Sequence, residues 1–289
     1  MKKKERRKKG RKPWLLGRWM ARLPSGCPLL YPIYLAAQLD TVEETLFSHA
    51  LPPAFDGLRI AFFSDVHYGT LLRKERVFAL AERVNALGAD LVLMAGDYAE
   101  NSTGAVDFFR MKPAFRARYA VLASLGNHDR TEPESNLPLL LDAMREDGVT
   151  PLVNDVWTME KDGKKLAVGA IDDYYNGVPD YEKVRALCAD ADYTIFLPHT
   201  PDAIPIAAGS GDKAFFDLLL CGHTHGGQVA FFGHSIHPTS DLKDRYRSGW
   251  FHEKGADILV TNGVGASGLP VRLGTRPQLH LITLRSMGR

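Results

Sequence analysis

The feature that most constrains this chain is a set of polar motifs, each placed directly after a short apolar run. An apolar run that ends in Gly, Asp, Asn or His is typical of a buried strand that leads into a tight turn. Ligands of open α/β sheets bind outside the carboxyl ends of the strands, so these motifs stand where one shared site requires them. The five motifs are Asp65-Val66-His67, Gly96-Asp97, Gly126-Asn127-His128-Asp129, His199 and Gly222-His223-Thr224-His225.

From residue 58 onward, apolar runs alternate with amphipathic stretches, and this alternation predicts an α/β layered domain. The turn at Asp162-Gly163 predicts a hairpin. We expect one folded domain over residues 51–289, preceded by a leader at 1–50. The patterns predict helices over 73–87, 134–147 and 181–189, and strands over 58–63, 89–95, 119–125, 151–154, 156–160, 165–171, 193–197, 215–220, 228–232, 257–261 and 278–284.

Each motif taken singly has an ordinary explanation, because Asp-x-His or Gly-Asp is more often a surface turn than a ligand pair. The segment Gly222-His223-Thr224-His225 is a stronger indication, since two imidazoles at i and i+2 after a strand are unusual for a loop. All five motifs together, each after an apolar run, favour a shared metal site over five independent turns.

The donors in these motifs are carboxylate, amide and imidazole groups, with no thiolate. Such a donor set suits Mn²⁺, Fe, Zn²⁺ or Ni²⁺. Seven donors are too many for one ion and fit two ions that share a carboxylate, an arrangement that clamps a phosphate and activates a water between the ions. The seven are Asp65, Asp97, Asn127, His67, His199, His223 and His225.

The net charge of +2 conceals a basic arm on an acidic body. Residues 1–22 hold eleven Lys or Arg and one Glu, a charge of +10, so the remaining residues carry −8. Trp14, Leu15, Leu16 and Trp19 accompany the basic residues, a combination typical of an interfacial anchor on an anionic membrane. A solvated basic tail is the alternative. Nucleic acid is not expected as a partner, because nothing basic follows in the acidic body.

The uncharged segment 23–39 is shorter than the ~20 residues of a spanning helix, and it contains Pro24, Pro28 and Pro32. We therefore expect peripheral attachment to the cytoplasmic face of the membrane, in preference to export or a single-pass anchor. Three cysteines without a C-x-x-C pair favour a reducing compartment.

With its five motifs in this order over residues 58–285, the chain resembles the calcineurin-like metallophosphoesterase superfamily. The extended segments 222–228 and 264–272 resemble a bacterial branch of membrane-associated phosphoesterases related to UDP-2,3-diacylglucosamine hydrolases. The resemblance implies a four-layer αββα sandwich of the metallo-dependent phosphatase type. It also implies that residues 51–289 are a catalytic domain holding two divalent ions.

Residue by residue, the resemblance assigns Asp65, His67 and His225 to one ion. It assigns the second ion to Asn127, His199 and His223, with Asp97 as the bridge between the two. The resemblance also implies that His128 faces the phosphate and helps protonate the leaving oxygen, and that Asp129 orients a histidine. Two bound ions would then supply a hydroxide as the nucleophile, with no covalent intermediate expected.

The motifs and the resemblance lead us to expect a metal-dependent hydrolase of a phosphodiester or pyrophosphate. The branch resemblance and the basic arm imply a lipid-linked substrate, such as a UDP-diacylglucosamine-type glycolipid precursor. The alternatives are a phosphodiesterase or phosphatase acting on soluble nucleotides, and a metal-binding scaffold without catalysis. Arg272 and Arg245 lie in loops after the motifs and are candidates for gripping the phosphate in a bidentate manner.

Overall fold

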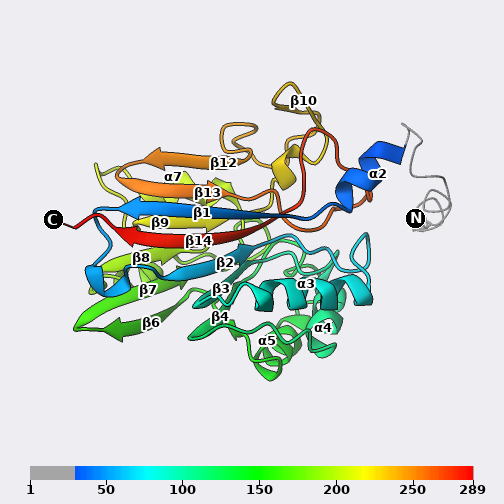
Figure 1. Ribbon diagram of the computed structural model, residues 1–289. Coiled ribbons are helices and arrows are strands. Elements are labelled where there is room, and N and C mark those ends of the chain that lie inside the picture. Colours follow the sequence, from blue (N-terminus) through cyan, green and yellow to red (C-terminus); the bar gives the residue numbers. More distant parts are fainter. Residues whose placement is uncertain (1–29, 289) are drawn as a thin grey trace, which may run out of the picture.

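The computed structural model describes residues 30–288, which form two six-stranded sheets packed face to face (Figure 1). The first sheet has the order β1-β14-β2-β3-β4-β5, and the second has the order β12-β13-β9-β8-β7-β6. The strands are β1 Asp40–Ser48, β2 Arg59–Phe63, β3 Leu91–Ala95, β4 Ala120–Ser124, β5 Thr150–Pro151, β6 Asp155–Lys161, β7 Lys164–Ala170, β8 Tyr193–Phe196, β9 Leu218–Cys221, β10 Ala230–Phe231, β11 His234–Ser235, β12 Gly249–Glu253, β13 Ala256–Val260 and β14 Gln278–Ser286.

Helices cover the outer face of each sheet, which gives four layers and confirms the expected αββα sandwich. One core lies between the first sheet and its helices, a second lies between the two sheets, and a third lies between the second sheet and its helices. The helices are α2 Tyr31–Ala36, α3 Lys74–Ala86, α4 Ser102–Arg110, α5 Asn136–Glu146, α6 Tyr181–Leu187 and α7 Ile204–Ala208, with short 3-10 turns at Pro53–Phe55, Pro201–Ala203 and His225–Gly227.

Strand β2 shows why buried strands could be predicted from apolar runs in the sequence. Ala61 and Phe63 pack into the core under the helices, whereas Ile60 and Phe62 pack into the core between the sheets. A strand buried on both faces appears as a continuous apolar run, because neither face requires polar residues. The same reasoning applies to β3, which is buried at every position.

The hairpin expected at Asp162-Gly163 joins β6 and β7, which pair antiparallel. Both turn residues have positive φ (52° and 68°), as a type I′ turn requires. The expected strand over 151–154 is wrong in extent, because β5 covers only Thr150–Pro151. The sequence analysis did not predict α2, α4, α7, β1, β11 or β12.

Strand β1 lies inside the segment that was expected to be a leader. It pairs in parallel with β14 along its whole length, from Asp40 opposite Gln278 to Ser48 opposite Ser286. The first sheet therefore begins ahead of the expected boundary at residue 50. The basic arm at residues 1–22 lies outside the described residues. Among the residues described, no helix is long and apolar enough to cross a membrane.

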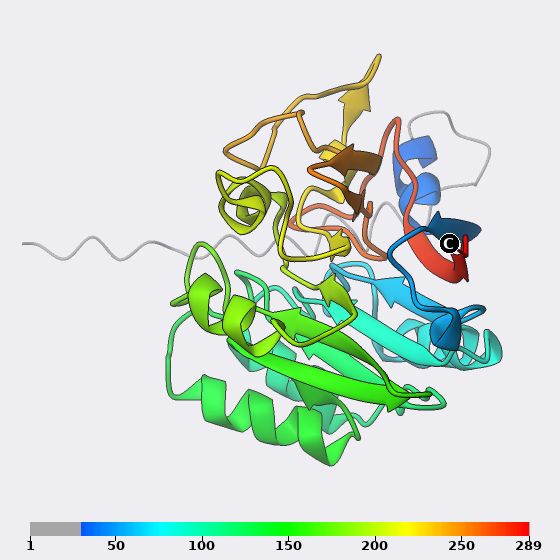
Figure 2. The same ribbon diagram turned by 90° about the vertical axis from the view of Figure 1, so that its left-hand side faces the viewer.

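The parallel strands β2, β3 and β4 of the first sheet and β7, β8 and β9 of the second place the motif loops at one end of the sandwich. A view along the sheets shows the two curved sheets stacked between their helices (Figure 2). The motif loops from both sheets meet at this end, between the two layers of strands.

Candidate metal centre

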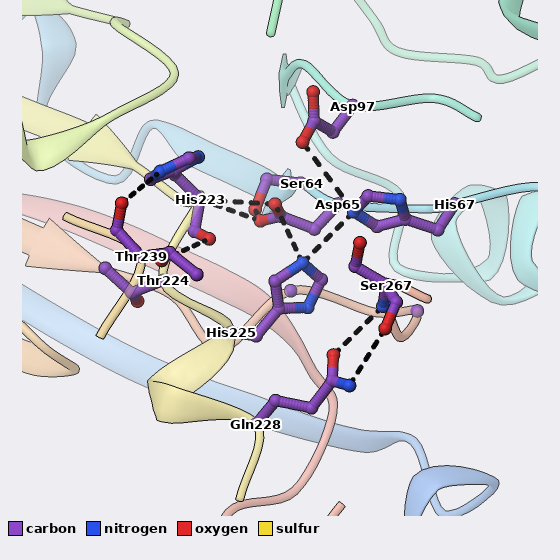
Figure 3. A network of polar contacts seen from close by, with 12 residues as sticks. Ser64, Asp65, His67, Asp97, His223, Thr224, His225, Gln228, Thr239 and Ser267 are labelled. Carbon is purple, nitrogen blue, oxygen red and sulfur yellow. Dashed lines mark hydrogen bonds and ion pairs between the residues drawn. The ribbon is translucent and has the colours of Figure 1, made fainter. Parts of the chain in front are cut away.

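The loops after β2 and β9 bring together the first group of candidate ligands, Asp65, His67 and His225. One ligand atom of each residue lies within 4.8 Å of the others. The Nε2 atoms of His67 and His225 are 3.1 Å apart, and Nε2 of His225 is 3.4 Å from a carboxylate oxygen of Asp65. Figure 3 shows the two imidazoles turned toward each other, with the Asp65 carboxylate beside them. All three side chains are buried.

A second group consists of Asp97, His199 and His223, from the loops after β3, β8 and β9. Nε2 of His199 lies 3.2 Å from Oδ2 of Asp97 and 3.2 Å from Nδ1 of His223. The same Asp97 oxygen is 3.6 Å from Nε2 of His67 in the first group. Asp97 is therefore placed between the two groups, as a shared carboxylate requires.

Asn127 completes the expected ligand set. Its amide oxygen is buried and has no hydrogen-bond donor among residues 30–288. A buried polar atom without a partner is costly unless something else binds it. The neighbouring Gly126 lies so close to Asp97 that a Cβ at Gly126 would collide with the Asp97 carboxylate. The loops after β3 and β4 are thus in direct contact, and the donor set fits two divalent ions.

Five of the candidate ligands adopt a backbone conformation that L-residues rarely take. Their φ angles lie between 46° and 69°, in the left-handed region. Such strain costs of the order of 1–3 kcal/mol per residue and tends to be retained at functional sites. A left-handed residue at each of these positions turns the backbone sharply just after the strand, which keeps the ligand side chain at the strand ends. The five are Asp65, His67, Asp97, His223 and His225.

Contacts behind the centre hold three of the imidazoles in orientation. Nδ1 of His199 lies 2.6 Å from the carbonyl oxygen of Ala95, and Nε2 of His223 lies 3.2 Å from that of Thr239. Nδ1 of His67 lies 3.0 Å from a carboxylate oxygen of Glu100. Each ring therefore has one nitrogen beside a protein acceptor and the other directed to the centre, as is usual for metal-binding histidines.

Glu100 is a residue that the sequence analysis missed. Besides His67, its carboxylate accepts a hydrogen bond from the Thr70 hydroxyl at 2.8 Å. Its backbone carbonyl lies 2.9 Å from Nδ1 of His128. Glu100 thus contacts two histidines of the site, and the only sequence signal was its place three residues after Asp97.

His128 stands beside both groups. One of its ring nitrogens lies within 4.8 Å of ligand atoms of His67 and Asp97, and its ring packs edge-on against that of His67 with centroids 4.9 Å apart. Its backbone N–H donates to the Asp97 carboxylate at 2.9 Å. Because Nδ1 is engaged by the Glu100 carbonyl, Nε2 of this half-buried ring is the nitrogen left for a substrate.

Asp129 was expected to orient a histidine, and its described hydrogen bonds go to the backbone of the motif loops. Its carboxylate accepts hydrogen bonds from the backbone N–H groups of Asp97 at 2.7 Å, Tyr98 at 3.0 Å and Gly126 at 2.9 Å. Asp129 therefore ties the loop after β3 to the loop after β4. Burial, with the nearby charge of Asp97, raises the pKa of Asp129 to about 7.

The charge balance of the centre favours a bound cation. Burial lowers the pKa of His225 well below its usual range, so its ring is neutral, the form that binds metals. Burial opposes ionisation of Asp97, yet the neighbouring His199 and His67 hold its pKa well below the usual range. Against the same burial, Asp97 raises the pKa of His199 to about 10. A cation beside Asp97 would compete with that proton.

The two arginines expected to bind substrate, Arg272 and Arg245, have partners within the protein instead. Arg272 is fully buried, and its guanidinium donates to the carbonyl oxygens of Gly265 at 2.6 Å and His225 at 3.0 Å. It braces the protein's own loops and is not exposed to a substrate. Arg245 has an exposed side chain that pairs with Glu253 at 3.2 Å. The Arg272 guanidinium thus reaches the metal centre from behind, 3.3 Å from Nδ1 of His225, and Arg245 pairs with another side chain.

Comparison with known proteins places these observations in context. Residues 58–227 match the family model described as calcineurin-like phosphoesterase. An uncharacterized metallophosphoesterase of Bacillus subtilis, YkuE, is 31% identical over 263 residues, which cover 89% of this chain and 89% of that protein. The phosphodiesterase YaeI of Escherichia coli is 28% identical over 243 residues, which cover 78% of this chain and 82% of that protein.

Among solved structures, the NAD nucleotidase of Haemophilus influenzae is similar with a TM-score of 0.47 and 17% sequence identity. The match covers 72% of this chain and 50% of that chain, so this chain corresponds to about half of the nucleotidase.

Proposed function

The chain belongs to the calcineurin-like phosphoesterase family and is a metal-dependent phosphoester hydrolase, and we propose that it cleaves a phosphodiester or pyrophosphate bond. The observation that carries the proposal is the position of Asp97 between two groups of ligands. Two ions that share a carboxylate clamp both the entering and the leaving oxygen of a phosphoryl group.

The ligand assignment follows the two groups. Asp65, His67 and His225 would hold one ion, while Asn127, His199 and His223 would hold the other, with Asp97 shared. When bound, two divalent cations, Mn²⁺ foremost, supply Lewis acidity to the phosphate and a water of lowered pKa. Fe, Zn²⁺ and Ni²⁺ match the same donors.

The protein's own contribution begins with His128. Its Nδ1–H donates to the Glu100 carbonyl, so Nε2 is the nitrogen that faces the substrate, and in the imidazolium form of the ring it can donate to a phosphate oxygen or give its proton to the leaving oxygen. Asp129 holds the backbone of Asp97 and Gly126 in place, and with it the relative position of His128 and the shared carboxylate. His128 acts on the substrate, whereas Asp129 acts by positioning.

A lipid-linked substrate is the finer proposal, in the manner of a UDP-diacylglucosamine-type precursor. It is supported by the +10 charge of residues 1–22, which suits an anionic membrane surface on the cytoplasmic side. The competing activity is hydrolysis of soluble nucleotides. A scaffold without catalysis is disfavoured because His128 stands beside a full set of ligands.

The decisive experiment uses protein reconstituted with Mn²⁺, with bis-p-nitrophenyl phosphate as the first substrate. We expect hydrolysis that a chelator abolishes and added Mn²⁺ restores. Absence of hydrolysis with every divalent metal would contradict the catalytic proposal and favour the scaffold. A panel of lipid-linked and soluble phosphoesters follows, and equal or faster turnover of soluble nucleotides would overturn the lipid-linked proposal alone.

A further inference from the structure

Large apolar side chains are exposed on three segments at the metal-centre end of the sandwich. Phe232, at the tip of the β10–β11 hairpin, is fully exposed, and the others are about half exposed. Exposed apolar groups that gather on one face mark an interaction site, unlike single ones scattered over a surface. This apolar rim consists of Tyr31 and Tyr34 on α2, Phe231, Phe232 and Ile236 on the hairpin, and Leu269 on the loop between them.

Backbone hydrogen bonds connect the three segments into one structure. The N–H of Arg272 donates to the carbonyl of Pro32 in α2 at 2.8 Å. One residue further, the carbonyl of Leu273 accepts from the N–H of Ala230 in β10, also at 2.8 Å. Both views show the loop before β14 running between the hairpin and α2 (Figures 1 and 2). The three segments that carry the apolar rim are therefore held to one another by backbone hydrogen bonds.

The same loop also forms a wall of the metal centre. The N–H of Gly265 donates to the carbonyl of Asp65 at 2.8 Å, and the buried Arg272 donates to the carbonyl of His225. Gly268 contacts the Glu100 carboxylate at 3.3 Å. The loop that carries Leu269 thus holds two candidate ligands on one side and the rim on the other. The rim is therefore next to the metal centre in the fold.

We propose that the apolar rim inserts into the interface of an anionic lipid bilayer and turns the metal centre toward the membrane. The proposal deepens the proposed function, because it specifies how a lipid-linked phosphoester reaches the centre. The chain that enters α2 carries +10 within its first 22 residues, which complements an anionic surface and a protruding aromatic tip. A protein partner is the competing occupant, and the test below separates the two.

The test compares Phe231→Ser/Phe232→Ser with the full-length wild type in binding vesicles of phosphatidylcholine with about one-third phosphatidylglycerol. Removing two inserted rings should weaken vesicle binding about tenfold or more. The defect should persist at about 1 M salt, where the attraction of the basic arm is screened. Phe47→Ser is the matched control, since Phe47 is an exposed ring on β1, at the opposite end of the sandwich.

A second measurement does not depend on loss of binding. Phe232→Trp should gain fluorescence that brominated lipids quench, beyond the quenching of the wild type, whereas Phe47→Trp should not. Unchanged vesicle binding by the double variant, or an equal loss in Phe47→Ser, would overturn the proposal. So would a wild type that binds no vesicles, which would leave a protein as the rim's partner. Hydrolysis of soluble bis-p-nitrophenyl phosphate reports on the proposed function separately and should be unchanged in every rim variant.

Discussion

At the metal-centre end of the sandwich, carboxylates and imidazoles are buried against one another, whereas at the opposite end charged groups line an open cavity of about 800 Å³. In that distal cavity Lys164 pairs with Asp192 at 2.8 Å, and Lys213 lies 3.8 Å from Asp217. None of these four residues has a positive φ, in contrast to five of the candidate ligands. A volume of this size would by itself be large enough for a small-molecule site.

The difference shows what marks a reactive site in this fold. An ion pair that reaches solvent, such as Lys164 with Asp192, contributes little energy and little reactivity, because water and the partner already satisfy its charges. The metal centre combines strained backbone at five candidate ligands with an unpartnered amide oxygen at Asn127, a combination typical of a site that binds a ligand. The two ends should therefore respond very differently to substitution.

The largest expected effect is that of Asp97→Asn. Losing the shared charge should lower kcat by about a thousandfold or more and reduce the number of bound Mn²⁺ ions, because both groups use this carboxylate. Steady-state hydrolysis and metal analysis of the dialysed protein measure the two effects. Lys164→Ala in the distal cavity is the control and should leave kcat unchanged; a comparable loss there would invalidate the contrast between the ends.

His128→Ala should have the next largest effect. We expect kcat to fall by about a hundredfold to ten-thousandfold, because the donor for the leaving oxygen is lost, with both ions still bound. His252→Ala, which removes an exposed imidazole on β12, is the matched control. If His128→Ala lost bound metal, this histidine would be a ligand, and its assignment as the proton donor to the leaving oxygen would be wrong.

Glu100→Ala should weaken Mn²⁺ binding about tenfold to a hundredfold, as is usual when a partner behind a ligating histidine is removed. Glu100→Gln should retain most of the affinity, because its amide oxygen can still accept from Nδ1 of His67 and from Thr70. Titration of the metal-free protein measures both variants. Equal weakening by Gln would mean that the charge matters more than the orientation of His67.

The metal centre was predictable to the extent that it lies in local motifs. Asp65, Asp97 and His223 each follow a strand that is buried on both faces, and such strands are visible in the sequence as apolar runs. The carboxyl ends of parallel strands then bring the motifs together. The layered architecture follows from the same alternation of strands and helices.

What the sequence did not predict depends on tertiary contacts. Strand β1 was missed because its sequence is rich in charge, with Glu43 and Glu44 in its middle, and its partner β14 is at the other end of the chain. Arg272 was expected to bind substrate, since a sequence does not tell whether a guanidinium faces solvent or backbone carbonyls. Glu100 acts through the orientation of His67, which no local pattern encodes.

The smallest expected effect is at the distal cavity, in Asp217→Asn. Burial raises the pKa of the Asp217 carboxyl above its usual range, against hydrogen bonding from Thr194 and the charge of Lys213. Between the pKa values of the unfolded and folded states the folded protein binds more protons, so stability falls as pH rises through that window. The asparagine should be more stable than the wild type at pH 8, by up to about 1 kcal/mol, and should show no gain below pH ~3.5. Urea unfolding at both pH values measures this. A variant that is less stable at pH 8 would show that the Lys213 pair outweighs burial, and the distal cavity would then resemble the metal centre in depending on its charges.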